Sequence, residues 1–196
     1  MDYISPDIDY VQDSPYRINC DDNNWIFDPP EGTRYIIFEN INQKAYDSIW
    51  PLFTSSLRMV EFYDGNLDYL FLPEGIEYVN APDLGLKRIH VPDSIYILYC
   101  DKNRLVEIDL PRNISKLYAT SNKLKRLTVR TENLERLEDI YLKNNPRLLK
   151  LDFKPPPMFC WLEVDEGVDV SQEIKDALLQ SGQADAAPLF QRGDSL

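Results

Sequence analysis

Histidine and cysteine are scarce in this chain of 196 residues, which has one histidine, His90, and three cysteines, Cys20, Cys100 and Cys160. A site with a histidine base would have to use His90, and no nucleophile motif accompanies it, which argues against a Ser-His-Asp or Cys-His enzyme. The cysteines are far apart and odd in number, so they fit neither a disulfide framework nor a Cys-x-x-Cys metal site. We therefore expect a non-enzymatic protein without metal or cofactor, in the cytoplasm or another reducing compartment.

Long apolar runs and glycine-rich loops are also missing. No run approaches the roughly 18 apolar residues of a membrane span, and the start, MDYISPDIDYVQD, has neither a basic nor an apolar signal region. We expect a soluble protein without a secretion signal or membrane insertion. The seven glycines form no phosphate loop, and the acidic pairs Asp21-Asp22 and Asp165-Glu166 lack the Asp/Asn/Gly order of a calcium loop.

Basic residues are outnumbered, since the formal net charge is −12. Phosphate contacts need clustered Lys and Arg, so this balance argues against a nucleic-acid partner. One basic island stands out, because residues 113–154 carry 10 basic and 5 acidic groups. It can be a solvated face or a docking patch, and we favour the solvated face.

Apolar residues recur instead with a period of 19 residues, which matches neither a helix nor a strand. The first column contains Leu57, Ile76, Ile95 and Ile114. Three, five and ten positions on, the columns hold Val60, Val79, Leu98 and Leu117; Phe62, Ala81, Cys100 and Ala119; and Leu67, Leu86, Leu105 and Leu124. A repeat this short cannot hold a strand and a full helix. It predicts a solenoid of stacked rungs, each with one brief strand, joined into a parallel sheet.

The pattern extends with distortion to about residue 30 and residue 164, and we count seven rungs, of which four are regular. An insertion after the first rung predicts a short helix, capped by Asn42 and carrying Ala45, Tyr46, Ile49 and Trp50. Asn103 and Asn122 share one column of the repeat.

The consensus P-x-x-I/L-x-x-L-x-A/C-x-x-N-x-L-x-x-I-x-L resembles the leucine-rich-repeat family, in the short form of secreted bacterial effectors and large DNA viruses. The resemblance covers about residues 25–165. It implies a leucine-rich-repeat solenoid with a parallel β-sheet on the concave face, extended or 3₁₀ segments on the convex side and short capping helices. It also implies that the Asn side chains bond backbone groups of the turns in adjacent rungs.

Tyrosine recurs at positions expected to point outward from the sheet. We expect the face to bind a protein partner, because exposed aromatic side chains on a rigid sheet give large contact area for few frozen torsions. The alternative is a purely structural ladder, since tyrosine suits strands. The predicted binding residues are Tyr78, Tyr99, Tyr118, Tyr141, Asp101, Lys116, Lys143 and Trp161.

We divide the chain into an N-terminal arm or cap (1–24), the solenoid (25–166), a C-terminal capping helix (167–182) and a flexible tail (183–196). Ser171 is expected to cap that helix, with Ile174, Ala177 and Leu178 on one face and Gly182 after its end. The Arg192-Gly193-Asp194 tripeptide in the tail is read as a chance match.

Two roles stay open. One is an effector-like adaptor that binds a protein through the tyrosine-rich face. The other is a structural subunit of a multi-protein assembly, such as a minor capsid component of a large DNA virus. The first would place the protein in a host cell and the second in a virion.

Overall fold

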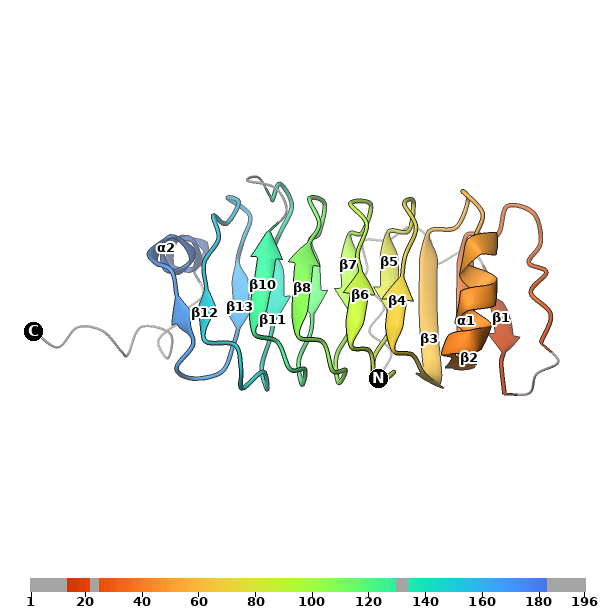
Figure 1. Cartoon of the computed structure of the whole chain (residues 1–196). Helices are drawn as coiled ribbons and strands as arrows, with labels where there is room; N and C mark the ends of the chain where they lie inside the picture. The colour runs from red at the N-terminus through yellow and green to blue at the C-terminus, as the bar shows by residue number, and fades with distance from the viewer. Residues whose placement is uncertain (1–13, 22–24, 130–133, 183–196) are drawn as a thin grey trace, which may run out of the picture.

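The computed structural model of the chain describes residues 14–21, 25–129 and 134–182. It is a parallel β-solenoid with few helices (Figure 1). One side is an eight-stranded sheet, the main sheet, in which every neighbouring pair is parallel. In spatial order its strands are β1 (Tyr16–Asn19), β2 (Tyr35–Asn42), β3 (Met59–Asn66), β5 (Tyr78–Asn80), β7 (Ile97–Tyr99), β9 (Lys116–Tyr118), β11 (Asp139–Tyr141) and β13 (Trp161–Glu163).

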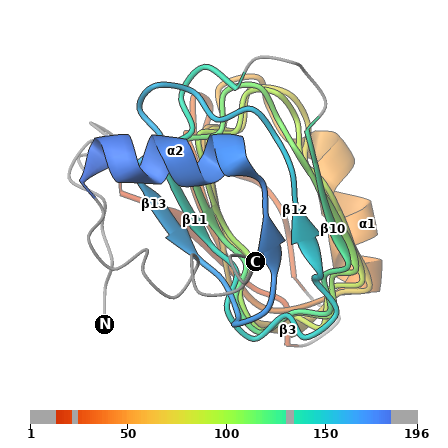
Figure 2. The same ribbon diagram turned by 90° about the vertical axis from the view of Figure 1, so that its left-hand side faces the viewer.

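The other side of the solenoid carries three short two-stranded sheets, and the core lies between the two sides (Figure 2). These pairs are β4 (Tyr69–Phe71) with β6 (Arg88–His90), β8 (Glu107–Leu110) with β10 (Arg126–Val129), and β12 (Lys150–Leu151) with β14 (Asp169–Val170). The return segments are therefore extended, and several of them form a second strand where one brief strand per rung was predicted.

The 19-residue columns are in register in the structure. Val79 pairs with Leu98 and Leu98 with Leu117, so each column is a row of side chains across the sheet. Every residue of the four predicted columns, including Cys100, is at most 1% exposed. The slipped rungs also face inward, since Leu148, Leu151 and Phe159 are buried. The repeat was predicted correctly.

A row of asparagines bonds the backbone inside the turns. The Asn103 side chain accepts from the N–H groups of Leu84 and Leu86 and donates to the carbonyl of Ala81, all in the preceding rung. Asn122 and Asn145 repeat this one and two rungs further on. The bonding that the resemblance implied is thus present, and it pairs buried backbone groups that no sheet ladder reaches.

Left-handed backbone recurs within β2 and β3 and shortly after several of the later main-sheet strands. Among the described residues, those with positive φ other than glycine are Asn40, Asp64, Asp83, Lys102, Ser121 and Asn144. Asn and Asp tolerate this conformation better than other residues with a side chain, which accounts for four of the six, Asn40, Asp64, Asp83 and Asn144.

Helix α1 (Gln43–Ile49) is the predicted insertion helix, and the 3₁₀ turn η2 (Trp50–Leu52) follows it. Its N-terminus is capped as expected, because the Asn42 side chain accepts from the N–H of Ala45 at 3.0 Å. Ala45, Tyr46 and Ile49 are buried, so the helix packs on the core.

Helix α2 (Gln172–Ser181) lies at the C-terminal end of the stack (Figures 1 and 2). It ends at Gly182 in the left-handed conformation, as expected, and buries Ile174 and Leu178. The predicted cap is wrong in one respect: Ser171 precedes the helix, but its hydroxyl makes no capping hydrogen bond and is buried without a partner within the described part of the chain.

Short strands also lie outside residues 25–166, the range assigned to the solenoid. Strand β1 lies in the segment assigned to the N-terminal arm and pairs with β2 as the first strand of the main sheet. At the other end, β14 lies in the segment assigned to the capping helix. The tail 183–196, with Arg192-Gly193-Asp194, and residues 1–13 lie outside the described residues.

Candidate binding surface on the main sheet

Three tyrosines stack on the outward side of the main sheet. Tyr99, Tyr118 and Tyr141 hold the same register position on β7, β9 and β11. The ring centroids of Tyr99 and Tyr118 are 4.3 Å apart at an interplanar angle of 13°, and those of Tyr118 and Tyr141 are 4.5 Å apart at 7°. These three residues, which we call the tyrosine stack, are spaced by the strand repeat of the sheet itself.

The tyrosine stack is partly buried, and this changes its acidity. Burial raises the pKa of Tyr99 and of Tyr118 to about 12, with a further contribution from the neighbouring phenols. Burial, followed by the charge of Asp139, also raises the pKa of Tyr141. The hydroxyls therefore stay protonated near neutral pH and are available as both donors and acceptors.

Trp161 continues the row on β13 at a neighbouring position. Its ring centroid lies 6.4 Å from that of Tyr141 at an angle of 32°, and the residue is 37% exposed. The structure thus places the rings of four predicted residues on one surface. Trp161 is the most exposed of the four.

The predicted charged residues flank the stack, and each already has a partner. Asp101 accepts from the N–H and the hydroxyl of Thr120 at 2.7 and 2.8 Å. Lys116 lies 3.5 Å from Asp139, and Lys143 lies 2.8 Å from Glu163. Such partly exposed ion pairs contribute little to stability, so a partner can exchange them for its own charges at small cost.

Tyr78 does not belong to the accessible surface. It points outward on β5 but is only 6% exposed, and its ring lies 5.9 Å from that of Tyr99. Ile97, outward on β7, is fully buried as well. Strand alternation indicates on which side of a sheet a residue lies but not whether that side is covered, so Tyr78 offers a partner much less surface than its outward position suggests.

A buried carboxylate lies on the same side of the sheet and was missed by the sequence reasoning. Glu61 is 7% exposed, and its two oxygens accept from the hydroxyls of Tyr35 at 2.6 Å and Tyr63 at 2.5 Å. Short bonds to a charged acceptor are strong, and they fix both tyrosine rings. The sequence gives little indication that Glu61 is buried, because a single glutamate at an outward position is expected to be solvated.

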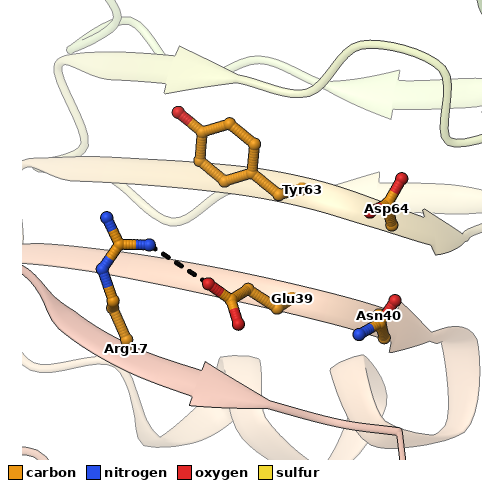
Figure 3. Close-up of a pocket in the computed structure, with 5 residues that line it drawn as sticks. All are labelled: Arg17, Glu39, Asn40, Tyr63 and Asp64. Atoms are coloured by element: carbon orange, nitrogen blue, oxygen red, sulfur yellow. Dashed lines mark hydrogen bonds and ion pairs between the residues drawn. The ribbon is translucent and has the colours of Figure 1, made fainter.

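Next to this network a pocket of about 410 Å³ opens at the N-terminal end of the sheet (Figure 3). It is lined by Arg17, Glu39, Asn40, Tyr63 and Asp64. An ion pair joins Arg17 to Glu39 at 3.1 Å, and the Asn40 amide donates to the Asn19 side chain at 3.3 Å. None of these residues was among the predicted site residues.

The histidine and the cysteines, which were considered as catalytic residues, lie in surroundings that do not activate them. His90 stacks on Phe71 at 4.7 Å and 10° and is exposed, on the side opposite the main sheet as expected. Burial raises the pKa of the Cys20 thiol to about 11 and that of Cys100 well above its usual value. Burial and Asp139 also raise the pKa of Cys160. High pKa values keep thiols protonated and weakly nucleophilic.

Four basic residues of the island form separate ion pairs. Besides Lys116 and Lys143, Arg126 pairs with Glu107 and Lys150 with Asp152. Arg130 lies outside the described residues. This distribution fits the solvated-face interpretation better than a docking patch.

The fold defines a class, the parallel β-solenoids. Comparison of the chain with protein-family models, with curated proteins and with solved structures gives no match. In residues 14–21, 25–129 and 134–182, no helix has the length and apolar character needed to cross a membrane, and no group of three or more His, Cys, Asp or Glu residues is arranged to hold a metal ion.

Proposed function

We propose that this chain is a non-enzymatic protein of leucine-rich-repeat type that binds a protein partner through the tyrosine stack and Trp161. The observation that carries the proposal is the stack itself, three partly exposed tyrosines held in register on a rigid sheet. Tyrosine and tryptophan bury large areas on binding and lose few torsions, which is why they dominate protein interfaces.

The stacking geometry favours a protein over a ligand that needs a free aromatic face. Tyr99 and Tyr141 cover the two faces of the Tyr118 ring. What a partner meets is a row of ring edges and hydroxyls, with Asp101, Lys116 and Lys143 beside it. Side chains and backbone groups of a protein can match this mixed surface, and the existing ion pairs can rearrange to do so.

In this proposal the main sheet is the concave side of a leucine-rich-repeat solenoid, and α2 caps its C-terminal end. The three free thiols support a reducing compartment, two of them buried in the core.

A sharp test replaces the centre of the stack and compares it with a tyrosine on the other side. The Tyr118→Lys variant puts a charge between two stacked rings, and Tyr69→Lys changes a tyrosine of β4 outside the main sheet. Each is used as bait for partner capture from the native source after circular dichroism and thermal unfolding have established its fold. Loss of one partner with Tyr118→Lys alone supports the proposal. Equal capture by both folded variants refutes it.

The alternative is a structural subunit of a larger assembly, and one observation favours it. Strands β1 and β13 end the main sheet, so their outer edges carry backbone groups without a strand partner in the described chain. Apolar residues are exposed toward the two ends of the described chain, with Ile26 78% and Leu179 59% exposed. Open edges with apolar side chains pair readily with neighbouring chains. Co-purification of many assembly components with both variants would favour this role.

A further inference from the structure

The pocket at the N-terminal end of the main sheet has side chains from three successive strands. Arg17 comes from β1, Glu39 and Asn40 from β2, and Tyr63 and Asp64 from β3. In Figure 3 the five side chains stand on the same side of the ribbons, around one opening. The site is therefore built from the sheet and not from a loose loop.

A distortion shared by two strands explains why consecutive residues line the same opening. In a regular strand, neighbouring side chains point to opposite faces. Asn40 and Asp64 have φ values of 56° and 59°, so the alternation breaks at both, and pairing resumes one residue later between Ile41 and Gly65. Glu39 with Asn40, and Tyr63 with Asp64, can thus act together.

The charges of the pocket do not balance. Arg17 is matched by Glu39 at 3.1 Å. The Asp64 carboxylate is exposed and has no hydrogen bond or ion pair within the described part of the chain. The lining therefore carries one net negative charge and a carboxylate with open acceptor positions. A cation is the complementary ligand.

The aromatic wall of the pocket is rigid. Tyr63 is 46% exposed, and its hydroxyl donates to the buried Glu61 carboxylate at 2.5 Å. Since that bond fixes the ring, its exposed part is a preformed surface for a flat cation. Asn40 donates its amide to Asn19, which leaves its carbonyl oxygen to accept from a ligand.

We propose that this pocket binds a guanidinium group, presented as an arginine side chain of a protein partner. Carboxylates of Asp64 and Glu39 and the Asn40 carbonyl accept from its planar set of N–H donors, and the Tyr63 ring stacks on it. A guanidinium fits better than an ammonium, because it forms bidentate bonds to carboxylates and stacks on aromatic rings. The choice of a guanidinium stands without the tyrosine stack, whereas its delivery on a protein rests on the proposed function.

The test uses small probes and the full chain. N-acetyl-arginine methylamide is titrated into ¹⁵N-labelled protein, and amide shifts are followed by NMR. The same titration is made with the lysine analogue and with the citrulline analogue, a neutral near-isostere of arginine. Saturable shifts at the lining residues are expected, with arginine binding more tightly than lysine and lysine more tightly than citrulline. Equal binding of citrulline and arginine, or no shift at the lining residues, overturns the proposal.

Variants separate the site from general electrostatics. Asp64→Asn keeps a residue that tolerates left-handed backbone and removes the charge. It should weaken arginine binding by about fivefold, since a charge-assisted hydrogen bond is roughly twice as strong as a neutral one. The matched control is Asp83→Asn, one repeat further on, with φ 54° and outside the pocket lining. Equal weakening by the two variants overturns the proposal. If the arginine probe does not bind while Tyr118→Lys still loses its partner, guanidinium binding in the pocket is refuted. The proposal for the tyrosine stack is then unaffected.

Discussion

The carboxylate of Asp165 accepts hydrogen bonds from the backbone N–H groups of both Asn144, at 2.9 Å, and Asn145, at 2.7 Å. In the preceding rungs, the N–H of the left-handed residue is bonded to a backbone carbonyl of the next rung, as Ser121 is to Lys143 at 2.8 Å. At the last rung a side chain therefore replaces the backbone acceptor. Asp165 ends this hydrogen-bond ladder, and its second oxygen also accepts from the N–H of the following residue, Asn145.

Replacing Asp165 by alanine should weaken the C-terminal end of the solenoid. Two N–H groups, one of them partly buried, lose a charged acceptor, and the free energy of unfolding should fall by about 2 kcal/mol. Urea unfolding followed by circular dichroism measures the change. Asp152→Ala is the control, because within the described residues Asp152 makes an exposed pair with Lys150 and no other, and its loss should change stability by less than about 0.5 kcal/mol. Equal effects would show that Asp165 has no special role.

Asn122→Ala should be more damaging, with a loss of about 3 kcal/mol. The Asn122 amide accepts from the N–H of Leu105 at 3.0 Å and donates to the carbonyls of Cys100 and Ala119 at 2.9 and 3.2 Å, all in buried surroundings. Without it, these backbone groups stay buried and unpaired. The measurement is the midpoint and slope of urea unfolding. Asn113→Ala, which removes one solvent-exposed bond to Asp93, should stay within about 1 kcal/mol of wild type.

Gly65→Ala tests the distortion shared by β2 and β3. A Cβ at this position would lie 2.5 Å from the Ile41 carbonyl oxygen, and the backbone φ is 149°. The backbones of β2 and β3 would have to move apart, so the free energy of unfolding should fall by about 3 kcal/mol. Gly167→Ala separates strain from crowding, since Gly167 also has positive φ, 88°, but nothing lies within 4 Å of its added Cβ. It should cost about 1 kcal/mol. A Gly65 variant as mild as the Gly167 variant would contradict the close approach.

The tyrosine stack should give alkaline pH dependence. Folding raises the pKa of Tyr99 and Tyr118 from about 10 to about 12, mainly through burial. Because the folded-state pKa is the higher one, the associated stability is complete below pH 10 and is lost as the pH rises toward 12. Absorbance at 295 nm should show a late-ionising class of tyrosines, and Tyr99→Phe/Tyr118→Phe should diminish that class. Ionisation of all tyrosines near pH 10 in the folded protein would be inconsistent with a partly buried stack.

The sequence predicted the solenoid because its apolar positions carry the period directly. Columns such as Ile76, Ile95 and Ile114 are buried in adjacent rungs as the spacing requires. Strand β1 was missed because residues 16–19 contain one fully buried apolar residue, Ile18, beside the partly buried Tyr16, and the segment after them has no leucine columns. A rung without its full set of apolar columns leaves no periodic signal.

The two surfaces were predicted unequally for a similar reason. Tyr99 and Tyr118 are one 19-residue period apart, and Tyr141 holds the same position in the next, longer repeat, so the repeat pattern places the three together. The pocket depends instead on the left-handed residues Asn40 and Asp64, which no period reveals. The Asp64-Gly65 pair is a turn signal, and it was the one local indication of a break in the strand.

The in-register stacking of the rungs sets fixed distances between surfaces on the main sheet. The pocket and the tyrosine stack lie on one sheet, separated along it by β5, and each strand adds about 4.8 Å. Removal of the 19 residues 73–91 would bring Pro92 to the place of Pro73 and leave the columns aligned. The distance between the pocket and the tyrosine stack would then be shorter by one strand spacing, and the residues of each surface would be unchanged. A partner that touches both would have to match that spacing, so the number of rungs between them is itself a determinant of what the protein can bind.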